Sequence, residues 1–156
     1  MRIKAIVCRI LALLGTLLVW FPVLAPLLGV LEYVSRPPTY EGPFNFDYLI
    51  PAELFPMALL GGVLLILAEL LAGQKGRLHR RLIFWGIGTA LAMLAGGQFV
   101  ATVSGLASGA TRPPSIWWYV VLGTLAFYVL GLVVMGTGGM LLLRDLFIPA
   151  RSRAGI

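Results

Sequence analysis

The class of this protein is decided by the stretch Ile116–Leu143, IWWYVVLGTLAFYVLGLVVMGTGGMLLL, which is long, apolar and uncharged. A helix needs about 20 predominantly apolar residues to cross the hydrocarbon core of a bilayer. Three further runs meet this requirement, and their only formal charges, Arg9, Glu53 and Glu69, lie near run ends. The expected helices cover residues 5–29, 53–73, 82–106 and 116–143. The sequence therefore predicts an all-α membrane protein with four transmembrane helices in an antiparallel bundle.

The composition excludes an ordinary soluble domain. Hydrophobic residues make up 60% of the chain and charged residues 12%, with a mean hydropathy of +0.96, whereas about a quarter of the residues in soluble domains are charged. The longest connection covers residues 30–52, and the connection over 74–81 is shorter still. We therefore expect one four-helix transmembrane domain over residues 1–156.

The basic residues, which give a net charge of +6, gather on one side of the predicted bundle. Segments on the cytoplasmic side of membrane proteins carry an excess of lysine and arginine, so we expect both termini in the cytoplasm and residues 30–52 outside. Anionic lipid headgroups explain such a face without nucleic acid. The expected headgroup contacts are Lys75, Arg77, Arg80 and Arg81. The compact chain without a targeting sequence suggests a multi-pass protein of a bacterial cell membrane.

The N-terminal segment imitates a secretory signal, with a basic start, an apolar run and small residues ending at Ala25. Pro26 would directly follow the cut and block processing, so we interpret the segment as a retained first helix. Cys8 is the only cysteine. Because a single thiol cannot form an internal disulfide, we expect Cys8 to be an inert packing residue.

Two connections on the predicted outer side share a motif. Ser35–Thr39 reads SRPPT and Thr111–Ser115 reads TRPPS, and each precedes a run that contains a glycine pair, Gly61–Gly62 or Gly138–Gly139. The repeated order fits two tandem helical hairpins that arose by duplication. Coincidence in a sequence of few residue types is the alternative.

The third expected helix carries two series of small residues at four-residue spacing. They are Gly88, Ala92 and Gly96, and Gly97, Ala101, Gly105 and Gly109. Small residues let a second helix approach closely in lipid. We expect these series to contact neighbouring helices of this chain, a partner membrane protein or a second copy.

Polar side chains and prolines collect in the outer half of the predicted bundle. Pro22, Pro26 and Pro56 each remove a helix hydrogen bond and leave a carbonyl without its usual partner, and we expect Pro22 and Pro26 to kink the first helix. Near them we place a candidate outer vestibule for a small polar or cationic ligand: Trp20, Glu53, Gln98, Thr102, Thr124 and Tyr128. Hydrogen bonds that join helices are the alternative role for the buried polar groups, and stabilisation of a helix start is the alternative for Glu53.

Two ionisable residues in the inner half suggest a structural ion pair. Glu69 lies near the end of its helix, where the dipole disfavours an anion, so it needs a cation. Arg9 lies at nearly the same predicted depth in the first helix, and we predict an Arg9–Glu69 pair. His79, the only histidine, we place on the surface near lipid phosphates.

No motif typical of catalysis, phosphate binding, metal binding or haem ligation occurs in the chain. We therefore expect no enzyme activity, no metal and no cofactor. The aromatic residues of Phe44–Tyr48 are expected at the membrane interface or over the vestibule. The leading hypothesis is an accessory, scaffold or assembly component of a membrane complex. The alternative is a small oligomeric transporter or channel, and a membrane enzyme is the third choice.

Overall fold

The structure is a computed structural model that describes residues 2–35, 54–73, 77–111 and 115–148. Within these residues it contains four α-helices: α1 (Arg2–Val34), α2 (Phe55–Ala72), α3 (Arg77–Val103) and α4 (Ile116–Phe147). Each helix is long and apolar enough to cross a membrane. The prediction of an all-α, four-helix membrane protein is therefore confirmed.

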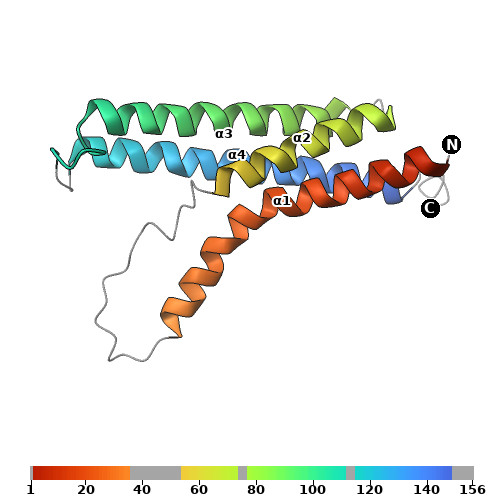
Figure 1. The fold of residues 1–156 in the computed structure, drawn as a ribbon, viewed down its shortest axis with the longest axis horizontal. Helices are drawn as coiled ribbons and strands as arrows, with labels where there is room; N and C mark the ends of the chain where they lie inside the picture. The colour runs from red at the N-terminus through yellow and green to blue at the C-terminus, as the bar shows by residue number, and fades with distance from the viewer. Residues whose placement is uncertain (1, 36–53, 74–76, 112–114, 149–156) are drawn as a thin grey trace.

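The helices alternate in direction and pack mainly as two antiparallel hairpins, α1 with α2 and α3 with α4 (Figure 1). The hairpins meet where α1 lies against α4, whereas α2 and α3 contact each other little. α1 and α3 begin, and α2 and α4 end, at what we call the basic end of the bundle. Its described lysine and arginine residues are Arg2, Lys4, Arg9, Arg77, Arg80, Arg81 and Arg144. We call the opposite end the loop end.

The helices differ from the predicted runs at their ends. α3 begins at Arg77 rather than at 82, and α1 continues to Val34 rather than 29. The reason is that hydropathy marks the apolar layer, while helical hydrogen bonding continues into charged sequence. α2 ends at Gly73, whose positive φ of 59° suits glycine and whose N–H donates to the Glu69 carbonyl. Pro56 lies in the first turn of α2, and the predicted helix start at Glu53 lies outside the described residues.

α1 bends toward the loop end. Figure 1 shows that its first part follows the bundle, while its last part (orange) diverges from the other three helices. Pro22 and Pro26 lie inside this continuous helix. A proline in a helix interior removes a hydrogen bond and clashes with the preceding turn, which bends the helix. The bend expected from the two prolines is therefore present.

In each hairpin, a glycine of one helix lies directly against a glycine of the other helix. A Cβ added to Gly61 would lie 2.7 Å from the Gly15 carbonyl oxygen, and one added to Gly86 would lie 2.8 Å from that of Gly131. The sequence motif aligned Gly61 with Gly138, whereas the equivalent contact uses Gly131, about two helical turns earlier. The repeated motif and the repeated contact are thus out of register, and the duplication stays a prediction.

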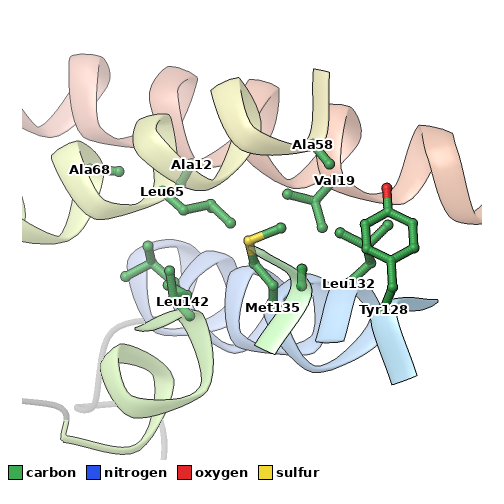
Figure 2. Close-up of a cluster of buried hydrophobic side chains, with 11 residues drawn as sticks. Ala12, Val19, Ala58, Leu65, Ala68, Tyr128, Leu132, Met135 and Leu142 are labelled. Carbon is green, nitrogen blue, oxygen red and sulfur yellow. The ribbon is translucent and has the colours of Figure 1, made fainter. Parts of the chain in front are cut away.

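The core lies where α2 and α4 face each other beside α1. Figure 2 shows Leu65 of α2 meeting Met135 of α4, with Val19 of α1 beside them. These side chains are almost completely buried. Close packing of this kind leaves the centre of the bundle filled by apolar side chains.

Candidate functional site

Trp20 lies in the contact between α1 and α4 and not in an open vestibule. A Cβ added to Gly136 would lie 2.7 Å from Trp20 Nε1, so the indole rests on the α4 backbone. One turn away, Thr16 contacts Gly139 equally closely, and its hydroxyl donates to the Ala12 carbonyl at 2.7 Å. Trp20 Nε1 is buried and has no hydrogen-bond partner among the described residues. Glycines on α4 therefore make room for polar side chains of α1.

Tyr128 is the second buried polar group of the predicted set. Only 1% of its surface is exposed, and its ring packs against Phe55 of α2 with 6.0 Å between ring centroids. Figure 2 shows its hydroxyl turned from α4 toward the side of α1 and α2. In the described part of the chain this hydroxyl has no hydrogen-bond partner. Along α4, Tyr128 lies about 12 Å from Gly136, where Trp20 packs.

The remaining described members of the set belong to α3 and to its contact with α4. Thr124 Oγ1 would lie 2.6 Å from a Cβ on Gly97, so Thr124 lies level with Gly97, the neighbour of Gln98 in the chain. The Thr124 hydroxyl donates to the Val121 carbonyl at 2.7 Å. Gln98 and Thr102 are exposed, and the Thr102 hydroxyl donates to the Gln98 carbonyl at 2.8 Å. These hydroxyls satisfy carbonyls of their own helices.

The predicted vestibule residues thus occupy three separate places. Trp20 and Tyr128 lie inside the bundle two turns apart, Thr124 lies between α3 and α4, and Gln98 and Thr102 lie on its outside. Glu53 and the aromatic segment 44–48 lie outside the described residues. The described members therefore do not converge on one point.

At the basic end, Glu69 of α2 and His79 of α3 form a buried pair. His79 Nε2 lies 3.6 Å from Glu69 Oε1. His79 is only 2% exposed and Glu69 6%, so the predicted surface position of His79 is wrong. Both residues lie about one turn from the connection between α2 and α3, and the short connection turns them toward each other. This pair is a polar contact between two helices that otherwise touch little.

Arg9 has a different partner from the one predicted. Its Nε donates to the Leu146 carbonyl at 3.3 Å, and its guanidinium lies 5.1 Å from the centroid of the Phe147 ring. Arg9 therefore interacts with the end of α4, where a cation is favoured by the helix dipole and by unpaired carbonyls. In the structure, Glu69 thus contacts His79, and Arg9 contacts the end of α4.

The sequence held a signal for the missed pair. Glu69 needed a cation, and His79 and Arg80 lie in the first turn of the next helix, after a short connection. Residues about one turn on either side of a tight helical connection meet at similar depth, so both were candidates, and the structure places His79 against Glu69. Arg9 and Glu69 were paired on their predicted depth, but depth does not determine which face of a helix a side chain occupies, and Arg9 lies against the end of α4.

The two small-residue series of α3 have different surroundings. Gly97, from the second series, packs against Thr124 of α4, whereas Gly105 and Gly109 lie beyond the end of α3 with φ of 75° and 74°, so the prediction that they belong to a helical series is wrong. In the first series, Cβ atoms added to Gly88 and Gly96 would meet nothing within 4 Å, and Ala92 is exposed. We call Gly88, Ala92 and Gly96 the open stripe. It leaves a strip of α3 backbone uncovered on the outside of the bundle.

Among the described residues, no cluster of three or more His, Cys, Asp or Glu side chains could hold a metal ion. Cys8 is buried with a free thiol, as expected for a packing residue.

The chain matches no family model, no curated protein and no solved structure.

Proposed function

We propose that this protein is an accessory or assembly subunit of a membrane complex, and that α3 docks a transmembrane helix of a partner or of a second copy. The observation that carries the proposal is the open stripe Gly88, Ala92 and Gly96, which has open space beside it. In lipid, close backbone approach at small residues drives helix association through packing. Large apolar residues would cover the helix better if lipid were its only neighbour.

The filled interior supports the same function. Leu65, Leu132 and Met135 occupy the centre of the bundle with almost no exposed surface, and the described vestibule residues are scattered. A carrier that worked as a single copy would need a continuous polar path through the bundle. This architecture therefore favours binding of other membrane helices by the outer surface over transport through the bundle.

The second candidate is an oligomeric transporter or channel. Gln98 and Thr102 are exposed on the outside of a helix long enough to span a membrane. In a ring of copies, these side chains would line a path between neighbouring chains. The amide of Gln98 would then contact a small polar or cationic solute.

We further propose the orientation and location. The basic end faces the cytoplasm of a cell membrane, in agreement with the rule that lysine and arginine accumulate on that side, and a bacterial membrane suits the compact chain. The chain termini would then be cytoplasmic. Accessibility of engineered cysteines at either end to an impermeant reagent tests this orientation in intact cells.

The docking proposal is tested by co-purification in mild detergent followed by mass spectrometry and crosslinking. We expect the wild-type chain to retain a specific membrane protein or a second copy, and Ala92→Leu to lose it because the added side chain blocks close approach. Ala126→Leu, at an exposed position of α4, is the matched control. A monomer without associated protein, or equal association of both variants, would contradict the proposal.

The transport alternative gives a different result. Reconstituted vesicles that contain only this protein would then show solute flux, and Gln98→Leu would reduce that flux. Vesicles that stay impermeable while a partner co-purifies would leave the subunit proposal standing.

A further inference from the structure

The basic end of α3 carries a notch on the outside of the bundle. Arg80, Arg81, Phe84 and Trp85 line a volume of about 250 Å³. Their spacing places two arginines directly above two aromatic rings on one face of the helix, about one turn apart. The notch therefore has a cationic level at the end of the bundle and an aromatic level nearer the middle of the membrane.

The arginines provide the anion-binding part. The guanidinium of Arg80 lies 5.8 Å from the centroid of the Phe84 ring, a cation–π contact that restricts its motion. Arg80 directly follows His79, which contacts Glu69. Arg81 is exposed beside it. Guanidinium groups bind phosphate oxygens through paired, charge-assisted hydrogen bonds, so two adjacent arginines suit one phosphate group.

The aromatic rings provide the lipid-facing part. Trp85 is 73% exposed and Phe84 49% exposed, although both belong to a helix that can cross a membrane. Indole rings prefer the boundary between headgroups and acyl chains, where the ring lies in the apolar layer and its N–H reaches polar groups. A soluble phosphate compound would use only the cationic level of the notch.

We propose that this notch binds an anionic phospholipid, with the lipid phosphate at Arg80 and Arg81 and the glycerol and upper acyl chains against Phe84 and Trp85. The other described arginine that packs on an aromatic ring, Arg9, already donates to the Leu146 carbonyl. The notch thus differs from a general basic surface. The inference requires insertion in a membrane, but it does not depend on the partner helix proposed for the open stripe.

The test is native mass spectrometry of the full-length protein in detergent, titrated with phosphatidylglycerol and with phosphatidylcholine of the same acyl chains. We expect phosphatidylglycerol to bind more tightly to the wild type. Each arginine lost removes charge-assisted hydrogen bonds to the lipid phosphate, so it should weaken binding about fivefold, which corresponds to about 1 kcal/mol. Arg80→Gln/Arg81→Gln should therefore lose most of the preference.

The controls separate the notch from its surroundings. Arg144→Gln removes the same charge from the same end of the bundle, on α4, and should keep the preference. Arg81→Gln alone should lose about fivefold and is informative if loss of Arg80 disturbs Glu69. Ala92→Leu should leave lipid binding unchanged even where it abolishes partner binding, so the two proposals fail separately.

Three outcomes would overturn the inference. The first is an unchanged lipid preference in Arg81→Gln and in the double variant. The second is an equal loss in Arg144→Gln, which would indicate diffuse attraction to the basic end. The third is displacement of the bound lipid by glycerol phosphate at equal concentration, which would indicate a site for free phosphate compounds.

Discussion

At the scale of single residues, the absence of side chains is what brings these helices together. Gly15 and Gly61 pack backbone against backbone, and the groups that an added Cβ would meet include carbonyl oxygens at 2.7–2.8 Å. A carbonyl in a helix cannot turn aside as a flexible side chain can. The tolerance of each glycine to substitution therefore depends on what lies opposite.

Gly61→Ala should lower the melting temperature in detergent. The added methyl group would clash with the Gly15 carbonyl and with Val19, and overpacking of this kind costs about 1–3 kcal/mol. Gly88→Ala is the matched control because its Cβ would meet nothing within 4 Å. We expect this control to keep or raise the melting temperature, since alanine favours the helix. Equal effects of the two changes would contradict the packing argument.

For Glu69 and His79 too, the effect of a substitution depends on the residue that lies opposite. Their side chains are buried and lie 3.6 Å apart. The contact is longer than a hydrogen bond, and His79 Nε2 has no hydrogen-bond partner among the described residues, so the two groups interact electrostatically. A buried polar group that is left alone costs about 1–3 kcal/mol. Glu69→Gln and His79→Leu should each lower the melting temperature, whereas the double variant should lose less than the sum of the two. Additive losses in this double-mutant cycle would show that the residues do not interact.

At the scale of elements, α1 and α3 each have two kinds of surroundings. In α1 the surroundings change along the helix, and in α3 they differ between two faces. The first part of α1 packs in the bundle, while the part beyond the bend leaves it (Figure 1). α3 presents Gly86 and Gly97 to α4 and the open stripe to the outside. The change of surroundings in α1 results from the proline pair. The difference between the two faces of α3 results from the glycines that each face carries.

Replacing both prolines should straighten α1. Pro22→Ala/Pro26→Ala restores two backbone N–H groups and the helix hydrogen bonds that they make. Spin labels at Leu31→Cys and Val120→Cys, both exposed positions, in a Cys8→Ala background should then move closer together. The same labels in the chain with both prolines are the control. An unchanged distance would assign the bend to packing instead of to the prolines.

At the scale of the whole molecule, the bundle is two tight hairpins joined mainly by α1 against α4. The joint consists of small contacts, Trp20 on Gly136 and Thr16 on Gly139, together with Arg9 at the end of α4. Packing and not hydrophobicity holds helices together in lipid. A few close contacts therefore determine how the hairpins are placed against each other.

Two coexpressed fragments, residues 1–75 and 76–156, should therefore associate and co-purify. Gly139→Leu should abolish this association because a Cβ there would lie 2.7 Å from Thr16 Oγ1 and 3.0 Å from Leu65 Cδ1. Gly123→Leu, where a Cβ meets nothing within 4 Å, is the control and should preserve association. Loss of association in both variants, or in neither, would contradict the assigned joint.

Much of the architecture could be predicted because each transmembrane helix is a local property of its own segment. The bilayer requires an apolar run of sufficient length, and it requires the run to satisfy its own backbone hydrogen bonds. Both conditions can be read from consecutive residues, as Ile116–Leu143 illustrates. The alternating direction of the helices, the bend at Pro22 and Pro26 and the collection of basic residues at one end follow from chain order.

The contacts between side chains were decided only when the helices packed. Which face of α1 meets α4 depends on the shapes of both helices, since Gly136 and Gly139 admit Trp20 and Thr16. That rotation directs Arg9 toward Leu146 and leaves Glu69 to His79. Amino-acid order places residues at a depth, but the rotation of each helix is a collective result of steric fit among all four. The scattered vestibule and the open stripe are consequences of that fit.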